Sequence, residues 1–320
     1  MADIKENVIL DDRTKAFGDT LIELAEKDDR VVLVSADSYV GGGGVEFRKR
    51  FPNRFYDFGI CEQNAASQAA GLALGGKVPF FNSIGNFVTL RCFEQIRNDI
   101  CRPQMSVILV GRAPGLNYAE QGPTHQTIGE LGALRTLPFI KIIAPADALD
   151  MRNAMIEAVR VGGPAYIRMH KKIMPRINKD GYKFEIGKGI VLSEGSDVTF
   201  IACENMVHQS IIAADLLAKE SVKAGVINMH TIKPIDKDLI INTSRKTILF
   251  VTAEEHTVMG GLGSAVAEIL AQFCDNKLIM VGLEDVFGVD GPYEPVMDYH
   301  GLNGSKMAKQ VLEFLKRGRN

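Results

Sequence analysis

Short apolar runs that alternate with longer amphipathic stretches are the feature that most limits how this chain folds. Candidate buried strands recur at residues 31–34, 78–81, 106–110, 140–144 and 165–169. The stretches between them predict helices at residues 63–74, 87–96, 128–134 and 149–159. Strands that alternate with helices are typical of an α/β fold, in which helices cover both faces of a mainly parallel sheet.

The same alternation resumes after a change of composition near residue 180. Residues 171–194 carry Lys, Pro, Asn and Gly with few periodic apolar positions, which indicates a connector. Beyond it, strands are predicted at residues 198–202, 224–227, 248–252 and 278–281, and helices at residues 207–217, 262–270 and 306–315. A chain of 320 residues corresponds to about two domains. We therefore expect two α/β domains, at residues 1–178 and 186–320.

Charge, hydropathy and cysteine content exclude several classes of protein. The net charge is −2, from 37 basic and 39 acidic residues, and no basic block indicates nucleic-acid binding. No apolar run reaches the roughly 18–20 residues of a membrane span, and the polar start does not resemble a signal peptide. The five cysteines are widely spread without a Cys-x-x-Cys pair. We therefore expect reduced thiols in a cytoplasmic protein, with no metal ligands of its own.

Several catalytic motifs are missing from the sequence. It contains no phosphate-binding loop of the Gly-x-x-x-x-Gly-Lys-Ser/Thr type, no His-Glu-x-x-His and no Gly-x-Ser-x-Gly. The glycine runs at residues 41–44 and 260–263 do not fit the Gly-x-Gly-x-x-Gly spacing of a dinucleotide site. The run at residues 260–263 is compatible either with an anion site at a helix start or with a tight turn.

Glu62 is the first candidate catalytic residue. It lies in the run Gly-Ile-Cys-Glu-Gln-Asn of residues 59–64, where a strand leads into a helix. We expect this carboxylate to lie at an accessible helix start, where a favourable interaction with the helix dipole is an alternative explanation. The helix continues with small residues at positions 65–71. These small residues permit close packing against another subunit or inside one domain.

A second candidate site is the polar loop of residues 119–126, which holds His125 and follows a predicted strand. Open α/β sheets bind their ligands in loops at the carboxyl ends of strands, which favours a functional loop over an ordinary helix start. Phe87 lies between the two candidates, beside the turn Ser-Ile-Gly-Asn of residues 83–86. The Phe87 ring either packs in the hydrophobic core or forms a wall on which a ligand stacks.

These motifs together resemble the transketolase family of thiamine-diphosphate enzymes. Gly-Ile-Cys-Glu62-Gln is similar to the family's cofactor motif, and Glu-Gln-Gly-Pro-Thr-His125-Gln to its substrate loop. Ala-Pro-Ala-Asp147 follows in the same order, and residues 254–256 with 260–264 resemble the start of the family's C-terminal domain. The resemblance covers nearly the whole chain, from the pyrimidine-binding domain through the C-terminal domain.

The resemblance implies roles for individual residues. Glu62 would be catalytic and would hold the pyrimidine N1′ of thiamine diphosphate, while Phe87 stacks on the pyrimidine. Ile84 and Leu90 occupy the flanking positions, where the family has aromatic residues. His125 would bind substrate and stabilise its oxygens during catalysis.

Further substrate contacts are implied at positions where this sequence departs from the family. Gln121 replaces the family's loop aspartate, and Gly41 stands where a serine helps to bind substrate phosphate. Lys171, with Arg168 nearby, loosely matches the family's basic residue for sugar phosphate. These departures leave open which sugars are used.

The family's diphosphate-binding domain is missing from this sequence. Its Gly-Asp-Gly motif has no counterpart, because Gly18-Asp19-Thr20 lacks the second glycine. The resemblance therefore implies the C-terminal half of a split transketolase, which moves a two-carbon ketol unit between sugar phosphates of the pentose phosphate type. A separate N-terminal subunit would supply the diphosphate site and the ligands of Mg²⁺ or Ca²⁺. We expect this chain to dimerise through residues 65–71 and to form a heterotetramer with that subunit.

Two alternatives remain at this point. The first is a related thiamine-diphosphate subunit, of the deoxyxylulose-phosphate synthase type or the β chain of a 2-oxoacid dehydrogenase. The Pro-Thr-His-Gln loop favours a sugar-handling enzyme over the 2-oxoacid chain. The second is a subunit that only scaffolds a partner, which the presence of Glu62 and His125 disfavours.

Overall fold

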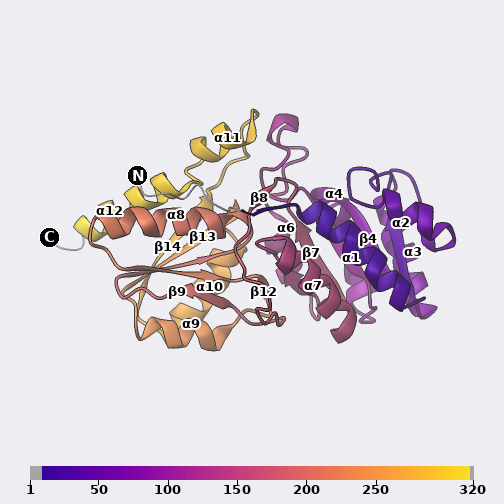
Figure 1. The fold of residues 1–320 in the computed structure, drawn as a ribbon, viewed down its shortest axis with the longest axis horizontal. Helices are drawn as coiled ribbons and strands as arrows, with labels where there is room; N and C mark the ends of the chain where they lie inside the picture. The colour runs from indigo at the N-terminus through magenta and orange to yellow at the C-terminus, as the bar shows by residue number, and fades with distance from the viewer. Residues whose placement is uncertain (1–8, 318–320) are drawn as a thin grey trace. The chain divides into compact units, whose positions relative to one another are not determined.

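Two mainly parallel sheets, one in each of two units, organise residues 9–317, which the computed structural model describes (Figure 1). Unit 1 extends to Pro114 and continues over Thr136–Ile186. Unit 2 comprises Gly115–Arg135 and the chain from Gly187 onward. The segment Gly115–Arg135 thus folds with unit 2, although unit 1 precedes and follows it in the sequence.

Parallel pairing dominates the sheet of unit 1. The strands of unit 1 are β1 (Leu10–Asp11), β2 (Val31–Ser35), β3 (Phe55–Asp57), β4 (Val78–Ile84), β5 (Ile108–Arg112), β6 (Lys141–Ile143), β7 (Ala165–Met169) and β8 (Met174–Pro175). The order β6-β7-β5-β4-β2-β3 is parallel throughout, and β1 and β8 form a separate antiparallel pair. Strands β2, β5 and β7 are buried at every position, which explains their continuous apolar runs.

Helices cover both faces of this sheet. They are α1 (Arg13–Lys27), α2 (Val45–Arg50), the 3₁₀ turn η1 (Pro52–Arg54), α3 (Glu62–Leu74), α4 (Gly85–Thr89), α5 (Phe93–Gln95), the π-helical turn η2 (Ile96–Cys101) and α7 (Ala148–Val161). Helix α1 packs on α7 over a core that includes Phe17, Phe80 and Met151. Helix α3 packs against β4 and η2.

Unit 2 has a sheet of five strands in the order β14-β13-β10-β11-β9. The strands are β9 (Ile190–Ser193), β10 (Val198–Ala202), β11 (Ala224–Asn228), β13 (Leu249–Thr257) and β14 (Lys277–Leu283), with the short strand β12 (Thr231–Lys233) outside this sheet. Only the edge strand β9 pairs antiparallel among these five.

Helices α8 (Asn205–Lys219) and α10 (Leu262–Phe273) pack on the sheet of unit 2, and α12 (Gly304–Arg317) lies beside α8 (Figure 1). Unit 2 also contains the 3₁₀ turn η3 (Ala119–Gln121), α6 (Glu130–Arg135), α9 (Lys237–Ser244) and α11 (Tyr293–Tyr299). The expected α/β class with mainly parallel sheets is confirmed.

The single helix predicted at residues 87–96 is wrong. The chain instead forms α4, breaks at Leu90–Cys92, and continues as α5 and the π-helical turn η2. Side chains at the break bond to the helix backbone: Thr89 Oγ1 donates to Gly85 O at 2.5 Å, and Cys92 Sγ to Val88 O at 3.2 Å. Such side-chain bonds compete with the regular helical pattern and bend it.

The small-residue stretch of α3 is the expected dimer contact. Ala65, Ala66, Ala69 and Ala70 are buried by the chain itself, between 0% and 7% exposed. These four alanines therefore pack inside unit 1, whereas Gln68 and Gly71 of the same stretch are exposed, and the dimer contact through residues 65–71 stays a prediction. No helix among residues 9–317 is both long and apolar enough to cross a bilayer.

Asp147, from the Pro-Ala-Asp motif, holds two parts of unit 1 together. Its Oδ1 accepts the Asp150 N–H at 2.8 Å and so caps α7, while Oδ2 accepts the N–H groups of Ile177 (2.9 Å) and Asn178 (2.6 Å). The side chain is buried, so these three donors have no easy access to water in its absence.

We predict that Asp147→Ala lowers the free energy of unfolding by about 2–4 kcal/mol, because a helix cap and two buried backbone donors lose their acceptor. Asp12 is a suitable control, since it caps α1 by accepting the N–H groups of Thr14 and Lys15. Its hydrogen bonds do not join α1 to a second segment as those of Asp147 do for α7. Asp12→Ala should lower the same free energy by about 1 kcal/mol. Urea unfolding of both variants measures the difference, and equal losses would contradict this role of Asp147.

Candidate active site

The carboxyl edge of the unit 1 sheet gathers most of the residues that the sequence singled out. In the strand register Ile84 of β4 pairs with Arg112 of β5, and Arg112 pairs with Met169 of β7. Because parallel strands end at the same edge, the loops that follow β3, β4, β5 and β7 begin there. Glu62 follows β3, and Phe87 follows β4.

Glu62 is buried, which corrects the expectation of an accessible helix start. It is the first residue of α3, and its side chain is 2% exposed. Arg91 Nη1 donates to its Oε2 at 2.8 Å. A carboxylate withdrawn from water needs such a charged partner, and the N-terminus of α3 adds a favourable dipole. Sequence reasoning missed Arg91, because nothing near it in the sequence indicates a carboxylate partner.

The Arg91 guanidinium also lies over the ring of Phe87, with 3.8 Å between its Cζ and the ring centroid. Phe87 is half-buried in α4, Ile84 precedes that helix, and Leu90 is 43% exposed at its end. One flat, hydrogen-bonding group is therefore stacked on Phe87 and bonded to Glu62 at the same time. The same pair of contacts suits an aminopyrimidine ring, so the residues present fit the pyrimidine of thiamine diphosphate.

Cys92 lies beside this carboxylate and is not an available nucleophile. Burial and then the nearby Glu62 carboxylate raise the pKa of the Cys92 thiol to about 12. The thiol donates to Val88 O and remains protonated at neutral pH.

Arg112 is a further residue at the carboxyl edge that sequence reasoning missed. It is largely buried, and its Nη2 donates to Ser38 Oγ at 3.0 Å. A Cβ atom on Gly41 would lie 2.0 Å from Arg112 Nη1, so a serine at position 41 would require this guanidinium to move. A basic residue two positions after the predicted strand of residues 106–110 was the available signal.

Two predicted phosphate contacts differ in accessibility. Arg168 lies inside β7 and is fully buried, whereas Lys171 lies two residues beyond β7 and is exposed. Lys171 is thus the one of the two that a dissolved anion reaches directly.

His125 and Gln121 belong to unit 2, in the segment Gly115–Arg135. His125 is half-buried; its Nδ1 lies 2.9 Å from Thr124 Oγ1, and Tyr118 meets its ring edge-on at 6.1 Å between centroids. Gln121 is exposed at the end of η3. The described structure thus joins Glu62 with Phe87 through Arg91 in one unit, and places the His125 loop in the other.

The glycine run at residues 260–263 is a tight turn around the protein's own carboxylate. Both oxygens of Glu254 accept backbone N–H groups at the start of α10, from Leu262 and Gly263, at 2.7 Å each. A Cβ atom on Gly261 would lie 2.0 Å from Glu254 Oε2. Glu254 therefore occupies the position that an external anion would take.

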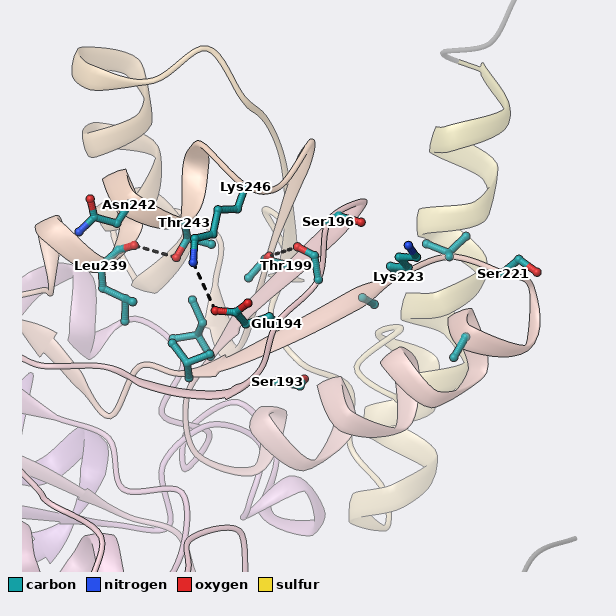
Figure 2. Close-up of a pocket in the computed structure, with 16 residues that line it drawn as sticks. Ser193, Glu194, Ser196, Thr199, Ser221, Lys223, Leu239, Asn242, Thr243 and Lys246 are labelled. Carbon is teal, nitrogen blue, oxygen red and sulfur yellow. Dashed lines mark hydrogen bonds and ion pairs between the residues drawn. The ribbon is translucent and has the colours of Figure 1, made fainter.

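The cavity drawn in Figure 2 lies in unit 2 and has a volume of about 720 Å³. Residues from β9, the start of β11 and α9 line it, and Lys246 pairs with Glu194 there at 3.3 Å. None of the site residues predicted from the sequence lines this cavity. Within residues 9–317, no group of three or more His, Cys, Asp or Glu side chains is arranged to hold a metal ion.

Comparison with known proteins identifies the family of this chain. The domain described as "Transketolase, pyrimidine binding domain" matches residues 12–176, and the one described as "Transketolase, C-terminal domain" matches residues 187–307. A protein of Methanocaldococcus jannaschii described as a transketolase C-terminal section is 36% identical over 306 residues, which cover 95% of this chain and 96% of that protein.

Two other similar proteins are matched over nearly their full length. The 6-deoxy-6-sulfo-D-fructose transketolase subunit SqwH of Clostridium sp. (strain MSTE9) is 35% identical over 301 residues, which cover 94% of each chain. A solved structure described as a split gene transketolase, inactive β4 tetramer, has a TM-score of 0.86 at 36% identity and covers 96% of this chain and 98% of its own. This chain belongs to the transketolase family and spans its pyrimidine-binding and C-terminal domains.

We predict that Glu62 and Arg91 are coupled in stability by about 1–2 kcal/mol, less than a fully buried pair because Arg91 is 38% exposed. A double-mutant cycle with Glu62→Gln and Arg91→Met, followed by urea unfolding, measures this coupling. The exposed pair Glu46–Arg50 is the matched control and should show a clearly smaller coupling. Equal coupling in the two cycles would mean that burial of Glu62 does not strengthen the ion pair.

Proposed function

We propose that this member of the transketolase family is the catalytic C-terminal half of a split, thiamine-diphosphate-dependent transketolase. In this proposal it transfers a two-carbon ketol unit from a ketose phosphate to an aldose phosphate. The observation that carries the proposal is the arrangement of Glu62, Arg91 and Phe87, in which a planar group is bonded to the carboxylate and stacked on the ring. The similar proteins matched over their full length support it, since they are described as transketolase sections or subunits.

The bound cofactor would supply the carbon nucleophile and the electron sink of the reaction. Glu62 then holds or donates a proton at the pyrimidine N1′, which is ordinary general acid–base work for a positioned carboxylate. Phe87 would stack on the pyrimidine, with Ile84 and Leu90 as the flanking residues. Arg91 would have to leave the ring face that the pyrimidine takes, because one face of a ring accommodates one stacked group.

The resemblance to the family implies the substrate contacts that we propose. His125 stabilises substrate oxygens as negative charge develops. Gln121 offers an amide that both donates and accepts, whereas the family's aspartate only accepts. Lys171 and Arg112 supply positive charge for the anionic end of the sugar, with Arg168 adding charge from within β7.

The assembly is also part of the proposal. The similar proteins that are matched over nearly their full length are described as a transketolase section or subunit, so a separate N-terminal subunit is expected to hold the diphosphate and the ligands of Mg²⁺ or Ca²⁺. Two copies of this chain and two of that subunit would form a heterotetramer. The structure described as an inactive β4 tetramer supports self-association of such chains, and its description as inactive agrees with a need for a partner. Residues 1–178 and 186–320 are the proposed pyrimidine-binding and C-terminal domains, in a cytoplasmic enzyme.

We predict that the purified chain alone has no transketolase activity, whereas the chain mixed with its N-terminal subunit, thiamine diphosphate and Mg²⁺ transfers the two-carbon unit. Product analysis with a panel of ketose donors measures this. Donors with a phosphate or sulfonate terminus should show a KM about tenfold lower or more than uncharged donors, because a charge-assisted bond to a basic side chain is lost in the uncharged ones.

Two results would contradict the proposal. Full turnover by the single chain would exclude the need for a partner. The other result is a reconstituted complex that transfers no ketol unit but instead decarboxylates pyruvate and joins the remaining two-carbon unit to an aldose. That result would identify the deoxyxylulose-phosphate synthase type.

A further inference from the structure

Glu255, on β13 of unit 2, is a buried carboxylate with a role other than that of its neighbour Glu254. It is 1% exposed. Its Oε1 accepts the Tyr293 hydroxyl at 2.5 Å and the Asn205 side-chain N–H at 3.2 Å. These two donors come from α11 and α8, so they fix the carboxylate from the side of the C-terminal domain.

The other oxygen of Glu255 holds the start of the segment that carries His125. Oε2 accepts the backbone N–H of Leu116 at 3.3 Å. The backbone passes so close at Gly115 that a Cβ atom there would lie 2.6 Å from Glu255 Cβ, and Gly115 has a φ of +62°. Only glycine suits both constraints.

The segment is closed on itself at this anchored point. Gly115 and Thr127 exchange two backbone hydrogen bonds, of 2.8 and 2.9 Å, and so bring the two ends of the loop of residues 115–127 together. Glu255 therefore holds the base of a closed loop, and His125 lies two residues before the end of that loop.

Other contacts with unit 2 hold the same loop further along. Gln126 Nε2 donates to Val289 O at 3.0 Å, and the Thr257 N–H donates to Ile128 O at 2.8 Å. A Cβ atom on Gly122 would lie 2.6 Å from Asp290 Oδ1, so the loop tip also lies close to the segment that precedes α11. The C-terminal domain thus contacts the loop at its base and its tip.

We propose that Glu255 is a positioning residue for the transfer reaction: it fixes the base of the loop of residues 115–127 on the C-terminal domain and thereby sets the location of His125. It acts through the Leu116 N–H, and no contact of Glu255 with substrate or cofactor is part of the proposal. This inference rests on the function proposed above, because it assigns a purpose to the position of His125.

An acceptor-only group is required at this point. Three donors converge on the carboxylate, from Leu116, Asn205 and Tyr293. In Glu255→Gln one oxygen becomes an NH₂ group, and either orientation of the amide sets that NH₂ against at least one of these donors. The substitution keeps the size of the side chain, so packing is preserved while the hydrogen bonding is broken.

Asp236→Asn is the matched control. Asp236 is also a buried carboxylate of unit 2 that accepts two backbone N–H groups, from Leu239 and Gly189, at 3.1 Å each. It has no contact with the loop among its hydrogen bonds. Both variants lose acceptor character at a buried site, but only Glu255→Gln loses it at the loop.

Amide hydrogen exchange, measured on the full chain, tests whether Glu255 anchors the loop. This measurement does not depend on enzymatic activity. Glu255→Gln should speed exchange of the amides at residues 115–127 by about tenfold or more, as expected for the loss of a bond to a buried charge. Asp236→Asn should leave these amides at the wild-type rate. Similar exchange of the loop in both variants would overturn the proposed anchoring.

Kinetics of the two-subunit enzyme test the effect on His125. Glu255→Gln should raise the donor KM by about tenfold or more while the dissociation constant of thiamine diphosphate stays at the wild-type value. In a His125→Ala background the same substitution should add no further rise, because both changes act through one side chain. A full additional rise in that background, or an unchanged KM in Glu255→Gln, would overturn the positioning role.

The two proposals fail in different ways. A wild-type complex that transfers no ketol unit refutes the proposed function, whereas the exchange experiment on the chain alone still decides the anchoring of the loop. Tyr293→Phe gives an intermediate check, since it removes one donor to Glu255 and keeps the bond to Leu116. Its loop exchange should fall between that of the wild type and that of Glu255→Gln, and exchange faster than in Glu255→Gln would contradict the anchoring through Leu116.

Discussion

The buried carboxylate of Glu62 imposes the strongest constraint on the proposed site. A charge withdrawn from water needs a donor that faces it, and Arg91 provides one from the break between α4 and α5. The same guanidinium covers Phe87, so three side chains from separate segments are held in one arrangement. A flat hydrogen-bonding group thus fits against both Glu62 and Phe87, and the proposed cofactor would replace the arginine in that place.

Carboxylates that accept backbone N–H groups explain several motifs that first suggested chemistry. Asp147 caps α7 and ties residues 177–178 to it. Glu254 caps α10, and Glu255 holds the base of the His125 loop. These residues shape the framework, which leaves Glu62 and His125 as the motif residues proposed to act in the reaction.

The architecture was accessible from the sequence because strands buried on both faces leave continuous apolar runs, as in β2 and β7. The pair of Glu62 with Arg91 was not accessible, since it depends on a local break in a helix that periodicity predicts as continuous. The place of residues 115–135 in unit 2 was not accessible either. It depends on contacts with residues more than a hundred positions away, such as Glu255, and no local pattern reports them.

The central claim is that Glu62 controls the proton chemistry of the bound cofactor, and exchange of the thiamine C2 proton measures it most directly. The experiment compares the complex of this chain and its N-terminal subunit with the same complex carrying Glu62→Gln, each saturated with thiamine diphosphate. The account predicts exchange slower by about 100-fold or more in the variant, because a positioned acid–base group is lost. The exposed substitution Glu46→Gln should leave the rate unchanged. Exchange at the wild-type rate in Glu62→Gln would contradict the account.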